Sequence, residues 1–340
     1  MLSRRKKVAR LFRKIVLGRL AGSGPFFLSH LVTARCNCRC PGCLWRDNNS
    51  AEMGTQEVED LYRAAAKRGF VANVLWGGEP LLRKDLPRLC STSQLERMLT
   101  VVITNGYYLA ERCEELVPHV DGLIISLDYA RPENHDAYRR CPGLFARAVE
   151  GIRRVRSRYP KVRVFLNCLL HRGNEEEVEE VACLGRELGV SVFFSPAMEG
   201  LSLENGFHNK EALPVPESLR KAAARLLELK KSGLPVNNSR RYLQEYLLEG
   251  QGFSCRVPLV FMTVMADGTA LNCFTPERPL GNIREEGFEG ILDKQSRKKL
   301  LHLGQRCQKC IVPDVVDTSF IWQLSPEPLY NALRVFLKGE

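Results

Sequence analysis

The chain has 340 residues, of which 44% are hydrophobic and 26% charged, and it carries a formal charge of +11. This length supports one large core or a domain with a smaller appendage, and the composition excludes a disordered, collagen-like or coiled-coil chain. No run reaches the roughly 20 apolar residues of a membrane span, and Lys14 and Arg19 interrupt the only apolar patch that resembles a secretory signal, so we expect a cytoplasmic protein.

The first predicted element is a basic amphipathic segment, residues 1–24. Eight Lys and Arg and no acidic residue occur in residues 1–20, beside apolar residues at helical spacing. Such a helix can lie peripherally on an anionic inner membrane face, where each basic residue adds on the order of 1 kcal/mol. A helix packed on the domain fits the pattern equally well. Nucleic-acid binding is not expected, because the rest of the chain lacks a comparable basic stripe.

Six strand–helix units are predicted between residues 25 and 214. The expected strands are 28–33, 72–76, 100–104, 122–127, 162–169 and 190–195. Amphipathic segments lie between them, and repeated units of this kind imply an α/β fold with a parallel sheet and right-handed crossovers. Asn174, which precedes three glutamates, is expected to cap the helix after the fifth strand.

The 13 cysteines are unlikely to form a disulfide framework in a reducing compartment, and those at ligand-like spacing indicate a metal site. Cys36, Cys40 and Cys43 follow the first strand. Three thiolates without a nearby histidine can hold three irons of a [4Fe–4S] cluster and leave the fourth iron open, whereas structural zinc prefers four closed ligands. The spacing therefore favours an iron–sulfur cluster over zinc. Cys38 lies too close in sequence to its neighbours to join easily.

Together with polar motifs at the strand ends, this C-x3-C-x2-C spacing resembles the radical S-adenosylmethionine (SAM) superfamily. The motif residues are Gly77-Gly78-Glu79-Pro80 after the second strand, Asn105 after the third, Ser126 and Asp128 after the fourth, and the segment His135–Arg139. The resemblance covers residues 27–312 and implies a partial (β/α)6 barrel. One departure is Gly42, where the family commonly has an aromatic residue on the adenine. Trp45 is a candidate replacement, or a core residue.

The resemblance also implies a SAM site at the carboxyl ends of the strands. Its predicted residues are Gly77, Gly78, Glu79, Pro80, Asn105, Ser126, Asp128, Arg139 and Asn167. The two glycines would let the backbone approach the methionine moiety, and Glu79 would accept a hydrogen bond from the ammonium. Ser126 and Arg139 would meet the carboxylate and ribose. Asn167 is either a ribose or adenine contact or a structural residue.

A second set of cysteines lies near the carboxyl end of the sequence. After a helical connector (residues 215–250), residues 251–315 contain a hairpin signal at Asp267-Gly268 and Cys255, Cys273, Cys307 and Cys310. This arrangement resembles the "twitch" domain, a shortened SPASM domain, and implies one auxiliary [4Fe–4S] cluster. Zinc is the alternative for four such thiolates. Residues 316–340 are expected to form a helical tail.

The implied reaction is reductive cleavage of SAM to a 5′-deoxyadenosyl radical that abstracts a substrate hydrogen. The electron would come from a flavodoxin- or ferredoxin-like donor, and the auxiliary cluster would oxidise the substrate radical or relay electrons. The substrate classes are a peptide, a sugar alcohol, or a lipid or isoprenoid. His208, in a long loop (residues 197–214), is an acid–base candidate or a solvated residue. The alternative function is a non-catalytic iron–sulfur or zinc-binding scaffold.

Overall fold

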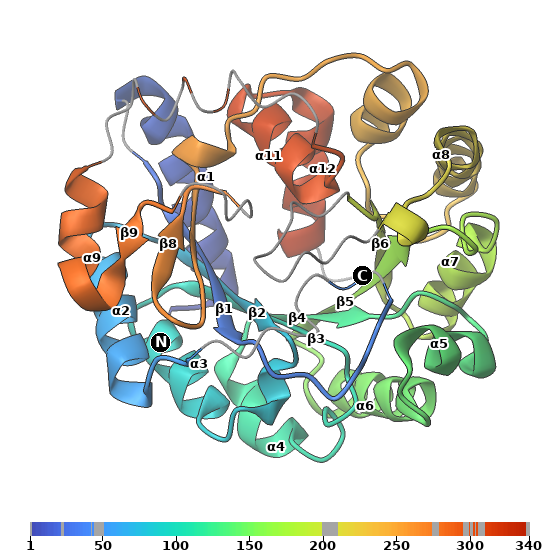
Figure 1. Cartoon of the computed structure of the whole chain (residues 1–340). Coiled ribbons are helices and arrows are strands. Elements are labelled where there is room, and N and C mark those ends of the chain that lie inside the picture. Colours follow the sequence, from blue (N-terminus) through green and yellow to red (C-terminus); the bar gives the residue numbers. More distant parts are fainter. Residues whose placement is uncertain are drawn as a thin grey trace.

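A curved, mainly parallel sheet forms the centre of the molecule, with helices along its outer face (Figure 1). The structure is a computed structural model that describes residues 2–21, 24–41, 43, 51–198, 210–273, 279–294, 299, 302, 304 and 310–337. Its strands are β1 (Phe27–Thr33), β2 (Ala72–Gly77), β3 (Leu99–Thr104), β4 (Gly122–Ser126), β5 (Arg163–Leu170), β6 (Ser191–Pro196), β7 (Phe261–Val264), β8 (Thr269–Leu271) and β9 (Gly281–Asn282). They are arranged in the order β6-β5-β4-β3-β2-β1-β7-β8-β9.

The first six strands are parallel and confirm the predicted α/β barrel. Each lies within one residue of its predicted bounds, because runs of β-branched and aromatic residues mark them clearly. The connecting helices are α2 (Thr55–Lys67), α3 (Leu86–Leu95), α4 (Cys113–Leu116), α5 (Pro132–Arg139), α6 (Leu144–Arg158) and α7 (Val178–Glu187), followed by α8 (Pro216–Lys231). Short 3-10 turns lie at η1 (Pro80–Leu82), η2 (Val117–His119) and η3 (Lys210–Ala212). This architecture brings the carboxyl ends of six strands to one side of the sheet.

The predicted cap of the helix after β5 is wrong. Helix α7 begins at Val178, and its N-cap is Glu177, without a side-chain hydrogen bond. The Asn174 amide instead donates to the carbonyl oxygens of Asp128 (3.0 Å) and Leu169 (2.9 Å). Asn174 therefore joins the ends of β4 and β5 rather than starting a helix.

The hairpin at the carboxyl end extends the barrel sheet. Strand β7 pairs in parallel with β1 and antiparallel with β8, and the turn lies at Asp267-Gly268 as predicted. The 3-10 turn η5 (Val257–Leu259) precedes this hairpin. Helix α9 (Ile283–Asp293) packs on α2, and the rings of Phe70 and Phe288 lie 5.4 Å apart. The hairpin and barrel thus share one sheet.

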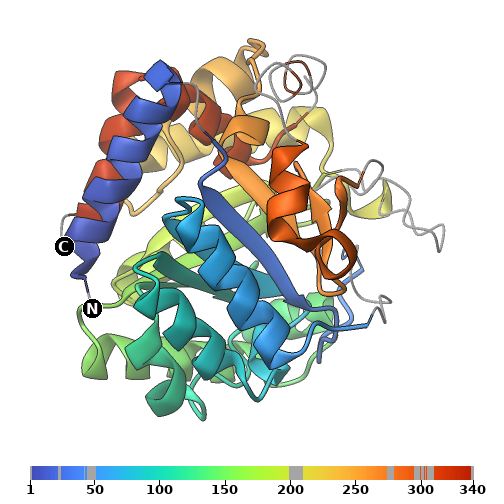
Figure 2. The ribbon, with the colours of Figure 1, turned by 90° about the vertical axis from the view of Figure 1, so that its left-hand side faces the viewer.

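The amino-terminal helix α1 (Arg4–Ala21) packs against the domain. It lies beside the terminal helices α11 (Pro313–Trp322) and α12 (Pro326–Leu337), as Figure 2 shows. Val8, Leu11 and Ile15 are buried in a cluster with Trp322, and Lys7 is 0% exposed and paired with Asp121 (2.8 Å). Part of the apolar stripe is therefore used for packing, whereas Val16 and Leu20 are exposed, and the predicted membrane contact stays a prediction.

Two further observations concern the membrane and the sheet edge. Within the described part of the chain, no helix has the length and apolar character needed to cross a bilayer. The outer edge of β6 is covered by the segment after α8, since Val236 bridges Val192 and the Asn238 side chain bonds both backbone groups of Phe194. A short π-helix, η4 (Tyr242–Leu248), completes the connector.

Candidate active site

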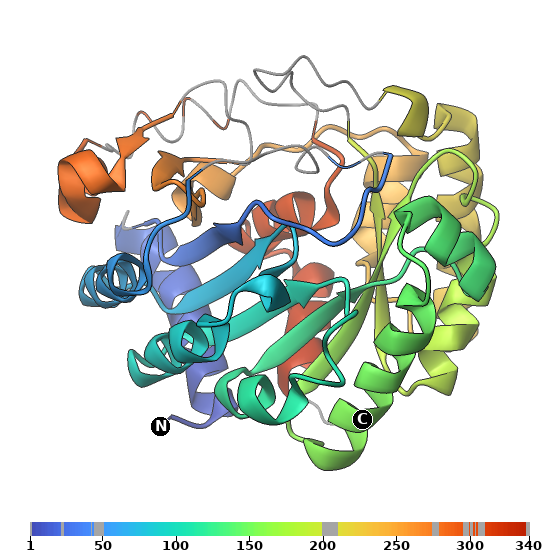
Figure 3. The same ribbon diagram turned by 60° about the horizontal axis from the view of Figure 1, so that its bottom comes forward.

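The loop after β1 runs across the carboxyl ends of the neighbouring strands (Figure 3). It is fixed at its far end by a hydrogen bond from the Arg39 amide to the Arg139 carbonyl oxygen (3.1 Å). Near its start, the Asn105 side chain donates to Asn37 Oδ1 (2.8 Å) and Cys38 Sγ (3.3 Å). Asn105, predicted to contact SAM, therefore holds the cysteine loop against the end of β3.

Two thiols of this loop, those of Cys36 and Cys40, are shifted toward the thiolate form that a metal requires, whereas the pKa of Cys38 is raised. The Cys38 thiol hydrogen-bonds to both Cys36 and Cys40, which lowers the pKa of Cys36 and brings that of Cys40 to about 7, with help from the charge of Arg139. Cys43 is tied to the loop by its amide, which donates to the Cys40 carbonyl (3.2 Å). In the residues described, no three Cys, His, Asp or Glu lie close enough to hold a metal as they stand. The donor chemistry nevertheless fits an iron–sulfur cluster.

Gly77 and Gly78 are required because the chain segments that leave β1 and β2 pack closely together. A Cβ atom on Gly77 would lie 2.2 Å from the Thr33 carbonyl oxygen, and one on Gly78 would lie 2.3 Å from that of Arg35. The amides of Gly78 and Glu79 donate to these same two oxygens, both at 2.8 Å. The close approach is thus to the start of the cysteine loop. The predicted approach to the methionine moiety stays a prediction.

The Glu79 side chain is engaged inside the protein, and its predicted contact with the SAM ammonium stays a prediction. It is 0% exposed and accepts hydrogen bonds from Leu81 N (2.9 Å), Thr104 Oγ1 (2.6 Å) and Asn105 N (2.7 Å). Burial raises its pKa, although these donors oppose the effect. A carboxylate enclosed in this way connects the ends of β2 and β3. Pro80 is also buried, at the start of η1.

Asp128 has a comparable structural role. It is 0% exposed, bonds Arg139 Nε through Oδ2 (2.7 Å) and accepts from Leu169 N through Oδ1 (2.9 Å). Burial acts to raise the pKa of Asp128, but the charge and hydrogen bond of Arg139, together with His135 and the Leu169 amide, outweigh it and the pKa is lowered. Asp128 is therefore an anion that orients Arg139, and Arg139 is the member of the pair left to meet a ligand.

A row of polar side chains lies on the carboxyl half of β4–β6. Ser126 is in register with Asn167, whose Oδ1 accepts from Ser195 Oγ (2.7 Å), and all three are half-buried between fully buried neighbours. Because alternate residues of a strand face opposite sides of a sheet, the three share its inner side. Ser195 was not predicted from the sequence. Ligand contacts of Ser126 and Asn167 stay predictions.

The described auxiliary cysteines lie where the hairpin meets the connector. Cys255 is buried, and Cys273 and Cys310 are half-buried against the main core. The Tyr246 hydroxyl donates to the Cys310 carbonyl oxygen, so the connector holds the backbone of this predicted ligand. Cys307 lies outside the described residues, as do Gly42, Trp45 and His208.

Two family models match the chain and decide its family. The radical SAM superfamily model matches residues 31–184, which contain the end of β1, the cysteine loop and strands β2 to β5. The SPASM iron–sulfur cluster-binding domain model matches residues 255–311. The chain belongs to the radical SAM superfamily.

Two solved structures share the fold of this chain. The crystal structure of SuiB from Streptococcus suis bound to S-adenosylmethionine covers 82% of the chain, with a TM-score of 0.65 and 14% identity, and 69% of SuiB is covered. The structure of anSMEcpe with bound AdoMet covers 93% of the chain and is itself 99% covered, with a TM-score of 0.60 and 17% identity.

Curated relatives match about half of the chain. An AdoMet-dependent heme synthase of Methanosarcina barkeri is 29% identical, over 50% of the chain and 50% of that protein. A PqqA peptide cyclase of Granulibacter bethesdensis is 27% identical, over 49% of the chain and 46% of that protein. The chain thus aligns with half or less of each.

The radical SAM barrel also contains an aromatic pair that the sequence did not reveal. Tyr138 and His171 stack with ring centroids 3.7 Å apart and an interplanar angle of 3°, and Tyr129 packs on the His171 ring at its edge. Among the described residues, neither the buried Tyr138 hydroxyl nor His171 Nε2 has a hydrogen-bond partner. Only the positions of these residues in the sequence could have indicated the pair, since Tyr138 directly precedes Arg139 and His171 directly follows β5. Both are candidates to face a bound ligand.

Proposed function

We propose that this radical SAM enzyme performs an oxidative modification of its substrate with one auxiliary cluster. When bound, the cluster of Cys36, Cys40 and Cys43 supplies the electron that cleaves SAM to methionine and a 5′-deoxyadenosyl radical. The observation that supports this most directly is the geometry of the cysteine loop, which is tied to Asn105 at the end of β3 and to Arg139 at the end of α5. The protein contributes position, charge and exclusion of water.

Arg139 is the residue that we propose meets the SAM carboxylate. Its guanidinium is held from one side by the buried Asp128 and lies close enough to Cys40 to lower the pKa of that thiol. A charge-assisted hydrogen bond to a carboxylate suits such an oriented cation. Ser126 and Asn167 would meet the ribose and adenine from the inner side of β4 and β5.

A single auxiliary cluster is consistent with the cysteine count. Residues 255–311 contain four cysteines, Cys255, Cys273, Cys307 and Cys310, which is the number needed to close one [4Fe–4S] cluster. A closed cluster has no iron open to substrate, so electron transfer is its available role. We propose that it accepts an electron from the substrate radical, with an electron relay as the alternative. A flavodoxin- or ferredoxin-like protein would reduce the first cluster.

A peptide is the substrate class that we propose first. One of the relatives above is named a peptide cyclase. A sugar alcohol and a lipid or isoprenoid remain the other two classes. Comparing peptides, metabolites and lipids of a deletion strain with those of wild type distinguishes the three, since only the true substrate class accumulates unmodified material.

Enzymatic function is tested by anaerobic reconstitution with iron, sulfide, dithionite and SAM. We expect wild type and Cys183→Ala to release 5′-deoxyadenosine and Cys40→Ala to release none, because Cys183 is a half-buried thiol on α7, away from the loop. A scaffold that only binds a cluster or zinc would release no 5′-deoxyadenosine in any variant.

A further inference from the structure

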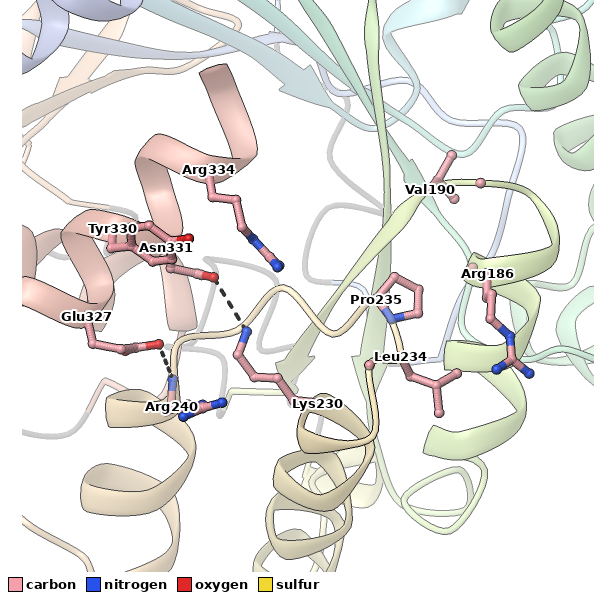
Figure 4. Close-up of a pocket in the computed structure, with 13 residues that line it drawn as sticks. Arg186, Val190, Lys230, Leu234, Pro235, Arg240, Glu327, Tyr330, Asn331 and Arg334 are labelled. Carbon is pink, nitrogen blue, oxygen red and sulfur yellow. Dashed lines mark hydrogen bonds between the residues drawn. The ribbon is translucent and has the colours of Figure 1, made fainter. Parts of the chain in front are cut away.

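A cavity of 490 Å³ lies at the amino end of β6, the opposite end of that strand from the SAM site (Figure 4). The turn between α7 and β6, the segment after α8, and α12 form its walls. In Figure 4, Lys230, Arg240 and Arg334 extend toward the space between α8 and α12. Arg186 lies on the wall across from them. The volume is within the range of about 300–1,000 Å³ that is usual for small-molecule sites.

The charge of this cavity is unbalanced. Four cationic side chains, Arg186, Lys230, Arg240 and Arg334, line it together with one carboxylate, Glu327. Glu327 is already engaged by the backbone amides of Arg240 (3.0 Å) and Arg241 (3.4 Å). None of the four cations forms an ion pair with any residue that the structure describes.

Lys230 is the most enclosed of the four. Its ammonium donates only to neutral acceptors, the Val236 carbonyl (2.9 Å) and Asn331 Oδ1 (3.4 Å). Burial lowers its pKa to about 8; Glu327 opposes this shift, whereas Arg334 and Arg240 add to it. A cation held among like charges in a partly dry cavity gains stability from a bound anion.

We propose that this cavity binds a small molecule carrying phosphate groups. Planar guanidinium groups match phosphate oxygens in pairs, and an enclosed ammonium adds a point charge. The Tyr330 side chain, 59% exposed at the rim, offers an aromatic face to the rest of the ligand. The phosphate belongs either to a soluble nucleotide-like metabolite or to a lipid headgroup, since α12 also packs beside α1.

The test measures the binding of inorganic pyrophosphate, used as a probe, to the full-length protein. Binding is measured by calorimetry at low salt. Wild type is expected to bind, and Arg240→Gln/Arg334→Gln to bind about tenfold or more weakly, because both exposed arginines can be changed without opening the core. Arg153→Gln/Arg158→Gln is the matched control: it removes the same charge from two exposed arginines on α6. Equal weakening by both double variants, or no binding by wild type, would overturn the proposal.

A second arm identifies the source of the phosphate. Sedimentation with phosphatidylglycerol vesicles that is lost in Arg240→Gln/Arg334→Gln assigns the cavity to a headgroup. Binding of ATP and pyrophosphate without this vesicle effect assigns it to a soluble ligand. The Cys40→Ala protein is expected to bind the probe like wild type, so failure of the SAM chemistry and failure of this site are distinguishable.

Discussion

The buried carboxylate of Glu79 accepts hydrogen bonds from Thr104 and Asn105 at the end of β3, and that of Asp128 accepts one from Arg139. The sequence identified both residues through their motifs, but their predicted contacts were with SAM. A motif gives a residue type and a position at the carboxyl edge of the sheet. It does not give the direction of the side chain, which here depends on donors from β3 and β5 that are distant in sequence.

The close packing of the segments that follow β1 and β2 depends on glycine at position 78. In Gly78→Ala, the new methyl group would lie 2.3 Å from the Arg35 carbonyl oxygen, so the backbone leading to Cys36 must move. We expect loss of the iron and sulfide of the cluster held by Cys36, Cys40 and Cys43, with the auxiliary cluster retained and near-normal circular dichroism. Gly252→Ala is the control, because nothing lies within 4 Å of its added Cβ. Normal iron content in Gly78→Ala would contradict this account.

His135 makes stability depend on pH. Its Nδ1 accepts from the Asp128 amide (3.2 Å), and burial, with the charge of Arg139, lowers its pKa to about 4. In the unfolded state this histidine binds its proton near pH 6.5, whereas in the folded state it does so only near pH 4. The free energy of unfolding present above pH 6.5 therefore falls by about 1.4 kcal/mol per pH unit as the pH drops from 6.5 toward 4.

This contribution is measured as the change in urea midpoint between pH 7 and pH 5. Asparagine at position 135 places an uncharged acceptor near Nδ1, so His135→Asn is expected to lose less stability on acidification than wild type. Because His30 is unchanged in both proteins, its own low pKa cancels in the comparison. Equal losses would show that His135 does not titrate in this window.

Helix α1 is the element whose environment the sequence left undecided. Its basic and apolar residues fit a membrane surface or a protein surface equally, because periodicity shows a face and not its partner. The buried Lys7 is the distinguishing feature. Its ammonium bonds both Asp121 (2.8 Å) and the Gln94 side chain, deep between α1 and the ends of α3 and β4.

Removing this ammonium is expected to destabilise the whole fold. In Lys7→Ala the Asp121 carboxylate loses its cation, and breaking a buried pair costs about 3 kcal/mol. The exposed neighbour in Lys6→Ala should change the free energy of unfolding by less than about 0.5 kcal/mol. Urea unfolding of both variants measures the difference, and equal stability would mean that α1 is not docked through Lys7.

At the scale of the whole molecule, the barrel and the auxiliary region share one sheet through β1 and β7. The sequence predicted the six barrel strands and the hairpin, since both are local patterns. It did not predict the parallel pairing of Phe27 with Phe261, because a contact across more than 200 residues leaves no periodic trace. The pairing fixes the auxiliary cysteines relative to the strand that leads to Cys36.

The central claim is that Cys36, Cys40 and Cys43 hold a cluster that cleaves SAM. Its most direct measurement is 5′-deoxyadenosine release by the anaerobically reconstituted, dithionite-reduced protein, alongside iron and sulfide analysis. We expect release by wild type, and a loss in Cys40→Ala of both the product and the sulfide of that one cluster, with the auxiliary cluster retained. Undiminished sulfide in Cys40→Ala, zinc in place of iron, or a wild-type protein that leaves SAM intact would contradict the account.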